Sequence, residues 1–143
     1  MNLSKTMKDI FQTNNPKEVS SGLNEFGDLL EYGDWNKNEI IESVNCLLSQ
    51  IRNISDLSII ENILHICFNI MNSHAVFSGF DLDTLVSCIN KLNSECISYV
   101  LTFLGFSGRR EYYTIIQSFL ENDVLRKDAE EALFELDYRT NKS

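Results

Sequence analysis

The sequence predicts an all-α protein of about eight helices. Apolar residues recur every three or four positions along most of the chain, which is the period of an amphipathic helix. No segment alternates apolar and polar residues for long enough to indicate a β-strand. A stripe that returns after thirty to forty residues predicts stacked helical hairpins, as in an α-solenoid. The stripe has the spacing i, i+4, i+7 and occurs at Ile60, Leu64 and Cys67, at Ile97, Leu101 and Leu104, and at Ala129, Leu133 and Leu136.

The pattern over residues 1–34 predicts two helices that cap the N-terminal end of the stack. The first is short and carries Leu3, Met7, Ile10 and Phe11 on one face. Pro16 suits the first turn of the second helix, because its fixed φ is helical and its missing N–H is not needed there. This second helix frays at Tyr32–Gly33, and its apolar face consists of Val19, Leu23, Phe26, Leu29 and Leu30.

Three helical hairpins are predicted over residues 36–138. In the first hairpin, Asn36 or Asn38 caps a helix that runs to about Ile51. Ser55 and Asp56 open its second helix, since short oxygen-bearing side chains accept hydrogen bonds from the first N–H groups of a helix. That second helix is apolar nearly all round, which predicts a central position.

The other two hairpins follow a loop at residues 73–79. Asp81 is expected to cap the first of their helices, and Ser107–Gly108 breaks the chain between the two hairpins. Connections of two to eight residues make successive helices antiparallel neighbours, in a single domain spanning residues 1–143. The tail after residue 138 is expected to fray. The four helices are expected at residues 81–92, 93–104, 112–120 and 122–138.

The chain is strongly acidic, with a formal net charge of −9 from 21 acidic and 12 basic residues. Phosphate groups would be repelled, so this charge disfavours nucleic acid and anionic membranes as partners and favours a basic protein. Residues 18–42 contain seven acids and one base, and residues 121–137 contain seven acids and two bases. No apolar run approaches the ~20 residues that span a bilayer, and no secretory signal is present. We therefore expect a cytoplasmic protein.

Side chains suited to catalysis or metal binding are scarce. The only local group of metal-ligand types is His65, Cys67 and His74, whose spacing matches no zinc motif. On a helix His65 projects roughly 200° away from Cys67. The sequence has no G-x-S-x-G elbow and no glycine-rich loop that could cradle a phosphate. We expect no catalytic residues, no metal site and no cofactor.

Aromatic and acidic residues gather in the loops that join one hairpin to the next. In an antiparallel stack these loops share one edge, whereas the loops within hairpins contain no aromatic residue. Aromatic residues and arginine most often anchor interfaces. Each aromatic residue taken alone could instead fold inward and seal the core, but as a set they predict a partner-binding edge. The predicted partner-binding residues are Glu31, Tyr32, Asp34, Trp35, Phe77, Phe80, Asp81, Asp83 and Tyr112.

Two charged groups near this edge have competing explanations. Arg109 and Arg110 could contact phosphate, but in a protein of charge −9 we expect them to pair with helix carboxylates. A series of four acids at i, i+3 spacing brings like charges together and costs a few tenths of a kcal/mol per pair, roughly. A solvated helix face explains this series, and so does a basic partner that relieves the repulsion. The acids are Glu25, Asp28, Glu31 and Asp34.

Residues 122–136 resemble the second helix of a HEAT-type repeat. That pattern has an acidic residue or Asn, then Val, a basic residue, Ala and a pair of leucines. The upstream copies keep only the apolar stripe. HEAT-like proteins are α-solenoid adaptors without catalysis, and the resemblance implies the same here. Allowing one extra residue between valine and arginine, the matching positions are Val124, Arg126, Ala129, Ala132, Leu133 and Leu136.

In its general character the chain also resembles bacterial immunity proteins, which neutralise the toxins of polymorphic or contact-dependent growth inhibition systems. This resemblance rests on small size, acidity and degenerate helical repeats. Such toxins are often basic nucleases, so the resemblance implies a toxin inhibitor whose acids imitate the phosphates of the toxin's substrate. Trp35, Phe80 and Tyr112 would be its apolar anchors. The sequence does not determine the oligomeric state, and a monomer is favoured. A general adaptor or structural subunit of HEAT type, which could self-associate, is the alternative.

Overall fold

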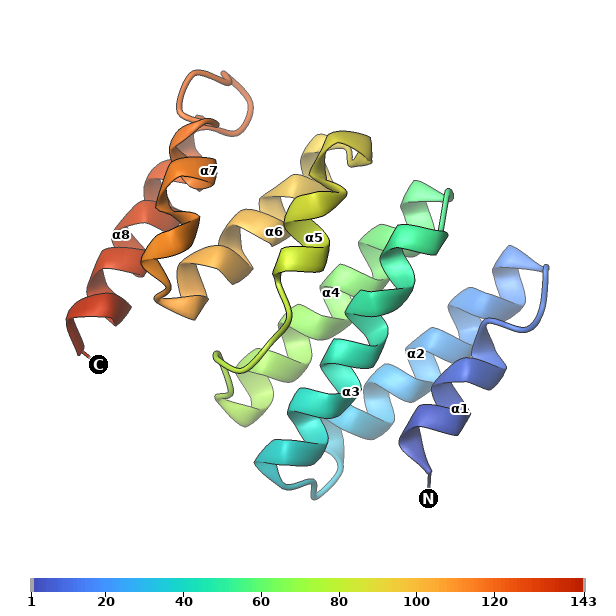
Figure 1. The fold of residues 1–143 in the computed structure, drawn as a ribbon. Coiled ribbons are helices and arrows are strands. Elements are labelled where there is room, and N and C mark those ends of the chain that lie inside the picture. The colour runs from blue at the N-terminus through green and yellow to red at the C-terminus, as the bar shows by residue number, and fades with distance from the viewer. Residues whose placement is uncertain (1, 143) are drawn as a thin grey trace. The chain divides into compact units, whose positions relative to one another are not determined.

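The structure, a computed structural model, describes residues 2–142, with side chains through Asn141. This part of the chain contains eight α-helices, three short 3-10 helices and no β-strand, so the predicted all-α fold is confirmed (Figure 1). None of the helices within it is both long and apolar enough to cross a lipid bilayer. The chain divides into two compact units, unit 1 (Met1–Val76) and unit 2 (Phe77–Ser143). The single domain and the α-solenoid stacking stay predictions.

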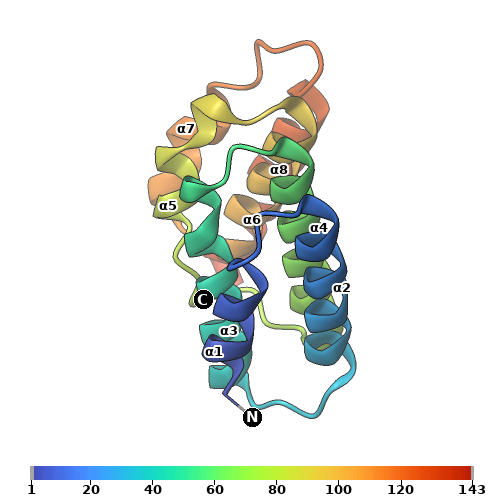
Figure 2. The same cartoon turned by 90° about the vertical axis from the view of Figure 1, so that its right-hand side faces the viewer.

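Unit 1 consists of four α-helices in two layers. These are α1 (Leu3–Ile10), α2 (Pro16–Tyr32), α3 (Lys37–Gln50) and α4 (Leu57–His74), with η1 (Ile51–Asn53) extending α3. The helix α1 lies beside α3, and α2 lies beside α4, so Figure 2 shows two helices on each side of the unit. The apolar faces of the two layers meet in a core that includes Leu23, Leu30, Ile40, Leu47, Leu48, Ile60, Ile63 and Leu64.

Each long helix of unit 1 begins at a side-chain cap. Asn15 accepts a hydrogen bond from the Lys17 backbone N–H at 2.9 Å, and Pro16 occupies the first position of α2 as predicted. Of the two candidate caps for α3, Asn36 is the one used, in a capping box with Glu39. Asp56 caps α4 as predicted. Short polar side chains therefore fix where these helices start.

Unit 2 contains two long helices and several short helical segments. They are α5 (Asp83–Ser87), η2 (Ile89–Lys91), α6 (Ser94–Ser107), η3 (Arg110–Tyr112), α7 (Tyr113–Gln117) and α8 (Arg126–Lys142). The helices predicted at 81–92 and 112–120 are thus wrong in length, because each is a short α-helix joined to a 3-10 helix. Serine, cysteine and β-branched residues, which have lower helix propensity than alanine or leucine, make up five of the twelve residues in the first stretch and four of the nine in the second.

Small residues let α6 and α8 approach closely. A Cβ atom added to Gly105 would lie 2.9 Å from the backbone oxygen of Ala132, so only glycine fits there. Ala129, Ala132 and Leu136 of α8 are buried, whereas Leu133, which the predicted stripe includes, is half-buried. The buried side of α8 is therefore rotated slightly from the predicted one.

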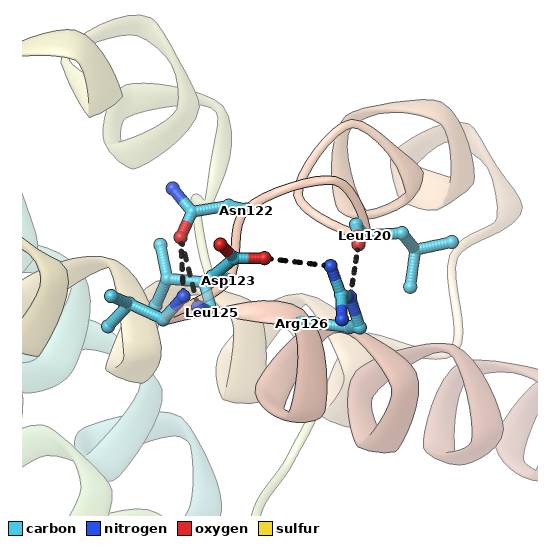
Figure 3. A network of polar contacts seen from close by, with 6 residues as sticks. Leu120, Asn122, Asp123, Leu125 and Arg126 are labelled. Carbon is cyan, nitrogen blue, oxygen red and sulfur yellow. Dashed lines mark hydrogen bonds and ion pairs between the residues drawn. The ribbon is translucent and has the colours of Figure 1, made fainter.

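The start of α8 is organised by the turn at residues 120–125 (Figure 3). The side-chain oxygen of Asn122 accepts hydrogen bonds from the backbone N–H groups of Val124 and Leu125, at 3.0 and 3.1 Å. Arg126 donates from Nε to the Leu120 carbonyl at 2.9 Å and pairs with Asp123 at 2.9 Å. Asn122 thus lies in the turn ahead of the helix, and the α-helix predicted to start at residue 122 begins four residues later, at Arg126.

The end of α8 does not fray after residue 138. The helix continues to Lys142, and Ser143 lies outside the described residues. The Arg139 guanidinium lies over the rings of Phe77 and Phe106, at 4.3 and 5.0 Å, and pairs with Glu135. The hydroxyl of Thr140 also donates to the Gly108 carbonyl at 2.6 Å. These tertiary contacts order a segment whose composition alone predicts fraying.

Candidate functional site

The nine predicted partner-binding residues fall into two sets. Glu31, Tyr32, Asp34 and Trp35 belong to unit 1, at and just after the C-terminal end of α2. Phe77, Phe80, Asp81, Asp83 and Tyr112 belong to unit 2.

In unit 1, Trp35 closes the end of α2. Its indole Nε1–H donates to the Leu29 carbonyl at 2.9 Å, and the ring is half-buried. A Cβ on Gly33 would lie 2.2 Å from that nitrogen, so the glycine makes room for the ring. His74 of α4 donates from Nε2 to the Leu30 carbonyl at 2.7 Å. Two carbonyls at the helix end thereby gain side-chain partners. Of the two alternatives for Trp35, packing inward against the fold or pointing outward as an interface anchor, the structure shows the inward one.

The residues around Tyr32 form an exposed acidic surface. Tyr32 is 80% exposed and lies one helical turn after Asp28. Glu31 accepts a hydrogen bond from the Ser73 hydroxyl at 3.1 Å. Among the described residues, no base forms an ion pair with the acids here. We call this the α2 surface; it consists of Glu25, Asp28, Glu31, Tyr32 and Asp34.

A polar groove of about 320 Å³ adjoins the α2 surface, between α2 and α4. Both carboxylates that line the groove, those of Asp28 and Glu31, also belong to the α2 surface. The walls carry more oxygen acceptors than cationic donors, so the groove is suited to an incoming guanidinium or ammonium group. The groove cannot be predicted from the sequence, because it requires the pairing of α2 with α4. Its lining residues are Asn24, Gly27, Asp28, Glu31, Asn62, His65, Ile66 and Asn69.

The acids of the α2 surface are placed where a helix disfavours them. Glu25, Asp28 and Glu31 repel one another at i, i+3 spacing. Glu31 also lies in the last turn of α2, near the negative end of the helix dipole, and no basic residue occurs in that turn. Each effect costs a few tenths of a kcal/mol, roughly. A positively charged partner would remove both costs.

In unit 2, the predicted aromatic anchors face inward. Phe80 and Tyr112 are only 6% and 4% exposed, so neither ring is free to anchor a partner. The Tyr112 hydroxyl donates to Asp83 Oδ1 at 2.7 Å. Burial, followed by this hydrogen bond to Asp83, raises the pKa of Tyr112. Asp83 thus holds a buried tyrosine, while Asp81, which is exposed, accepts a hydrogen bond from Thr84 at 3.1 Å.

The remaining predicted aromatic residue, Phe77, is half-buried and supports an arginine. Its ring contacts Phe106 edge to face at 4.9 Å and lies beneath Arg139. The prediction that Arg109 and Arg110 pair with carboxylates is confirmed. Arg109 pairs with Glu111, and Arg110 pairs with Asp137 of α8.

Unit 2 has two exposed features in addition to the predicted partner-binding residues. A groove of about 190 Å³ between α6 and α8 is lined by three carboxylates, those of Asp128, Glu131 and Glu135. On the outer side of α8, Phe134 is 73% exposed. A signal for Phe134 was present in the sequence, because it is an apolar residue that lies off the stripe of Ala129, Leu133 and Leu136.

The described residues contain no group of three or more His, Cys, Asp or Glu side chains arranged to hold a metal ion. His74 is committed to the end of α2, and Cys67 is fully buried. Burial raises the pKa of the Cys67 thiol, so it stays protonated. The most exposed aromatic ring of each unit, Tyr32 or Phe134, lies within one helical turn of carboxylates. Comparison of the chain with models of protein families, with curated proteins and with solved structures found no match.

Proposed function

We propose that this chain has no catalytic activity and acts as an immunity protein, which binds and neutralises a basic cognate toxin. One observation carries the proposal: the α2 surface places an 80% exposed Tyr32 beside carboxylates that no described base neutralises. A basic patch on a toxin would supply the missing positive charge. If the toxin is a nuclease, Asp28 and Glu31 would occupy positions that phosphate groups of its substrate otherwise take.

The physical chemistry of the α2 surface favours a protein over other partners. A net charge of −9 repels polyanions and steers basic proteins toward the molecule. Tyr32 adds a rigid ring that buries apolar area with little loss of side-chain entropy, and an aromatic anchor at the centre of an interface contributes ~2 kcal/mol or more. The combination of steering and anchoring suits fast and tight association.

The surface is also held in place before any partner arrives. Trp35 and His74 each bond a backbone carbonyl in the last turn of α2, next to Tyr32. Ser73 restrains the Glu31 carboxylate. Preorganisation of this kind increases affinity, since less conformational entropy is lost on binding.

The test begins with affinity capture of the partner from the native organism at low and at high salt. We expect a stoichiometric basic protein that is retained at about 50 mM salt and released at about 500 mM, because screening weakens exposed charge pairs. Expressed alone, this partner should be toxic, and co-expression with the present chain should abolish the toxicity. A partner without toxicity would contradict the proposal. A neutral partner or self-association, insensitive to salt, would favour the adaptor alternative.

Charge reversals then locate the surface. Asp28→Lys with Asp34→Lys changes the α2 surface, and Asp9→Lys with Glu121→Lys is the matched control on other exposed positions. Each pair raises the formal charge by four, from −9 to −5. We expect the α2 pair to slow association about tenfold at low salt and to flatten its salt dependence. Equal slowing by the control pair would show that only net charge matters.

A further inference from the structure

Unit 2 holds three of its own arginines with the same two groups, an aromatic ring and a carboxylate. The distances from the guanidinium carbon to the ring centroids are 5.5 Å for Arg109, 4.9 Å for Arg110, and 4.3 and 5.0 Å for Arg139. Stacking and ion pairing act together on a planar guanidinium, because its faces and its edges are separate binding surfaces. The ring and carboxylate partners are Tyr112 and Glu111 for Arg109, Tyr113 and Asp137 for Arg110, and Phe77, Phe106 and Glu135 for Arg139.

The outer side of α8 presents the same two groups without an arginine. Phe134 is 73% exposed, and the exposed residues Glu130 and Glu131 lie four and three positions before it on the helix. Side chains at these spacings are neighbours, with Cβ atoms roughly 5–6 Å apart. Among the described residues, no cation lies over the Phe134 ring, and none pairs with either glutamate. We call Glu130, Glu131 and Phe134 the α8 face.

We propose that the α8 face binds an arginine side chain of a basic protein, with the guanidinium stacked on Phe134 and paired with Glu130 or Glu131. The inference rests on the proposed function and deepens it, since it states the chemistry by which the basic partner would be held. Arginine is preferred over lysine here because an ammonium group is a strongly hydrated point charge that does not stack.

A second copy of this chain does not fit the α8 face. Each copy carries a net charge of −9, so the two faces would repel each other. The arginines of unit 2 are also already paired with carboxylates: Arg109, Arg110, Arg126 and Arg139. A basic partner brings cationic side chains that are not already paired, and these would complement the negative charge of the α8 face.

The neighbouring groove gives room for more than one basic side chain. Glu131 lines it together with Asp128 and Glu135, and Asp128 makes no ion pair with any described residue. An arginine stacked on Phe134 would therefore leave Asp128 available to the next basic side chain of the partner.

The experiment uses the full chain and two capped helical peptides of alanine and leucine, one with four arginines on one face and the other with four lysines. We expect the arginine peptide to bind about fivefold more tightly, as measured by titration calorimetry. Phe134→Ala should remove this preference. It should leave the affinity for the lysine peptide within about twofold, because the substitution does not change the electrostatic attraction, which both peptides share. Phe134 is exposed, so the variant should fold normally, which circular dichroism can verify.

Tyr32→Ala is the matched control, since it removes the exposed ring of the α2 surface and should leave the arginine preference intact. Glu130→Gln with Glu131→Gln should weaken the binding of both peptides and flatten its dependence on salt. Equal affinity for the two peptides, or a preference that persists in Phe134→Ala, would overturn the inference. So would a preference that Tyr32→Ala abolishes, or sedimentation that shows a dimer dissociated by Phe134→Ala.

The peptide assay needs no natural partner, so its failure is distinct from failure of the proposed function. If a toxic partner is neutralised and the peptides show no arginine preference, the immunity function stands and the α8 assignment falls. If the peptides show the preference and no toxin is found, the reverse holds.

Discussion

The two units carry similar charge and use it differently. Unit 1 has ten acids and five bases, and unit 2 has eleven acids and seven bases, giving net charges of −5 and −4. In unit 2, four acids neutralise arginines of the same unit: Glu111, Asp123, Glu135 and Asp137. In unit 1, the acids of the α2 surface form no ion pair with a described base. Net charge alone therefore does not reveal where uncompensated charge lies.

The aromatic residues differ in a parallel way. Unit 1 uses its only tryptophan to finish α2 and leaves Tyr32 exposed. Unit 2 uses Phe77, together with other rings, to hold arginines and leaves Phe134 exposed. The most exposed ring of each unit, Tyr32 or Phe134, thus lies beside carboxylates that form no ion pair with a described base, and among the other described aromatic side chains only Tyr138 is exposed. This difference between structural and free groups identifies the two candidate binding surfaces.

The largest expected effect comes from comparing one close helix–helix contact within each unit, at Gly27 in unit 1 and at Gly105 in unit 2. Gly105→Ala would place a Cβ 2.9 Å from a backbone oxygen, whereas Gly27→Ala would meet the side chain of Ile66 at 3.0 Å. A side chain yields more easily than a backbone, and alanine gains about 1 kcal/mol of helix propensity over glycine at both positions. We expect Gly105→Ala to destabilise the protein by about 2 kcal/mol and Gly27→Ala to be near neutral. Urea denaturation measures both, and equal effects would contradict the distinction.

The next prediction compares an arginine of unit 2 that stacks on aromatic rings, Arg139, with one that forms only polar contacts, Arg126. Arg139→Ala removes a stacked and ion-paired guanidinium whose side chain is about 28% exposed, and should lower the unfolding free energy by about 1 kcal/mol. Arg126→Ala breaks an ion pair to an Asp123 side chain that is 93% exposed, and should cost clearly less. Arg139→Lys should recover only part of the loss, because lysine does not stack. Thermal unfolding followed by circular dichroism would test this order, and a full recovery by lysine would exclude stacking.

A third effect of similar or smaller size tests the end of α2. Gly33→Ala would place a Cβ 2.2 Å from the Trp35 indole nitrogen and 2.6 Å from the Leu29 carbonyl oxygen. It should therefore displace the ring and break its hydrogen bond to Leu29, at a cost of about 1 kcal/mol, because Gly33 lies at a helix end, which shifts more easily than two packed helices. Because the chain has a single tryptophan, its fluorescence reports this position directly, and we expect a red shift as the indole becomes solvated. Ser73→Ala is the control, since it touches Glu31 and leaves the indole in place. An unshifted spectrum in Gly33→Ala would show that the ring has another stable position.

Much of the fold could be predicted from the sequence, because long amphipathic helices carry two independent signals. For α2, α3, α4 and α6, an apolar stripe and a capping residue agree on the same segment. For α5 and α7 the stripe was present, but it does not distinguish an α-helix from a short α-helix joined to a 3-10 helix. The extension of α8 through residues 139–142 depends on Phe77 and Phe106, which are distant in sequence and invisible to local propensity.

The candidate site was less predictable than the fold. The sequence indicated the acidic series on α2 and the aromatic residues, yet it could not determine which rings face inward. Tyr32 is exposed, while Phe80 and Tyr112 are buried, and the difference arises from tertiary packing and from the hydrogen bond between Tyr112 and Asp83. The grooves require knowledge of which helices lie side by side. Local sequence therefore identifies candidate chemistry, and packing determines which of it is free.

The smallest expected effect has opposite signs in the two units. Glu25→Gln with Asp28→Asn removes like-charge repulsion on α2 and should raise the unfolding free energy by a few tenths of a kcal/mol, roughly. Asp137→Asn breaks the pair with Arg110 and should lower it by about 0.5 kcal/mol, because both side chains are half-exposed and water screens them. Both changes remove negative charge, so a general effect of net charge would move stability in the same direction in each. Chemical denaturation at low salt resolves the signs, and about 0.5 M salt should reduce both effects. If the α2 variant is more stable and also binds the basic partner more weakly, the repulsion on α2 is retained for binding, since stability alone would favour its removal.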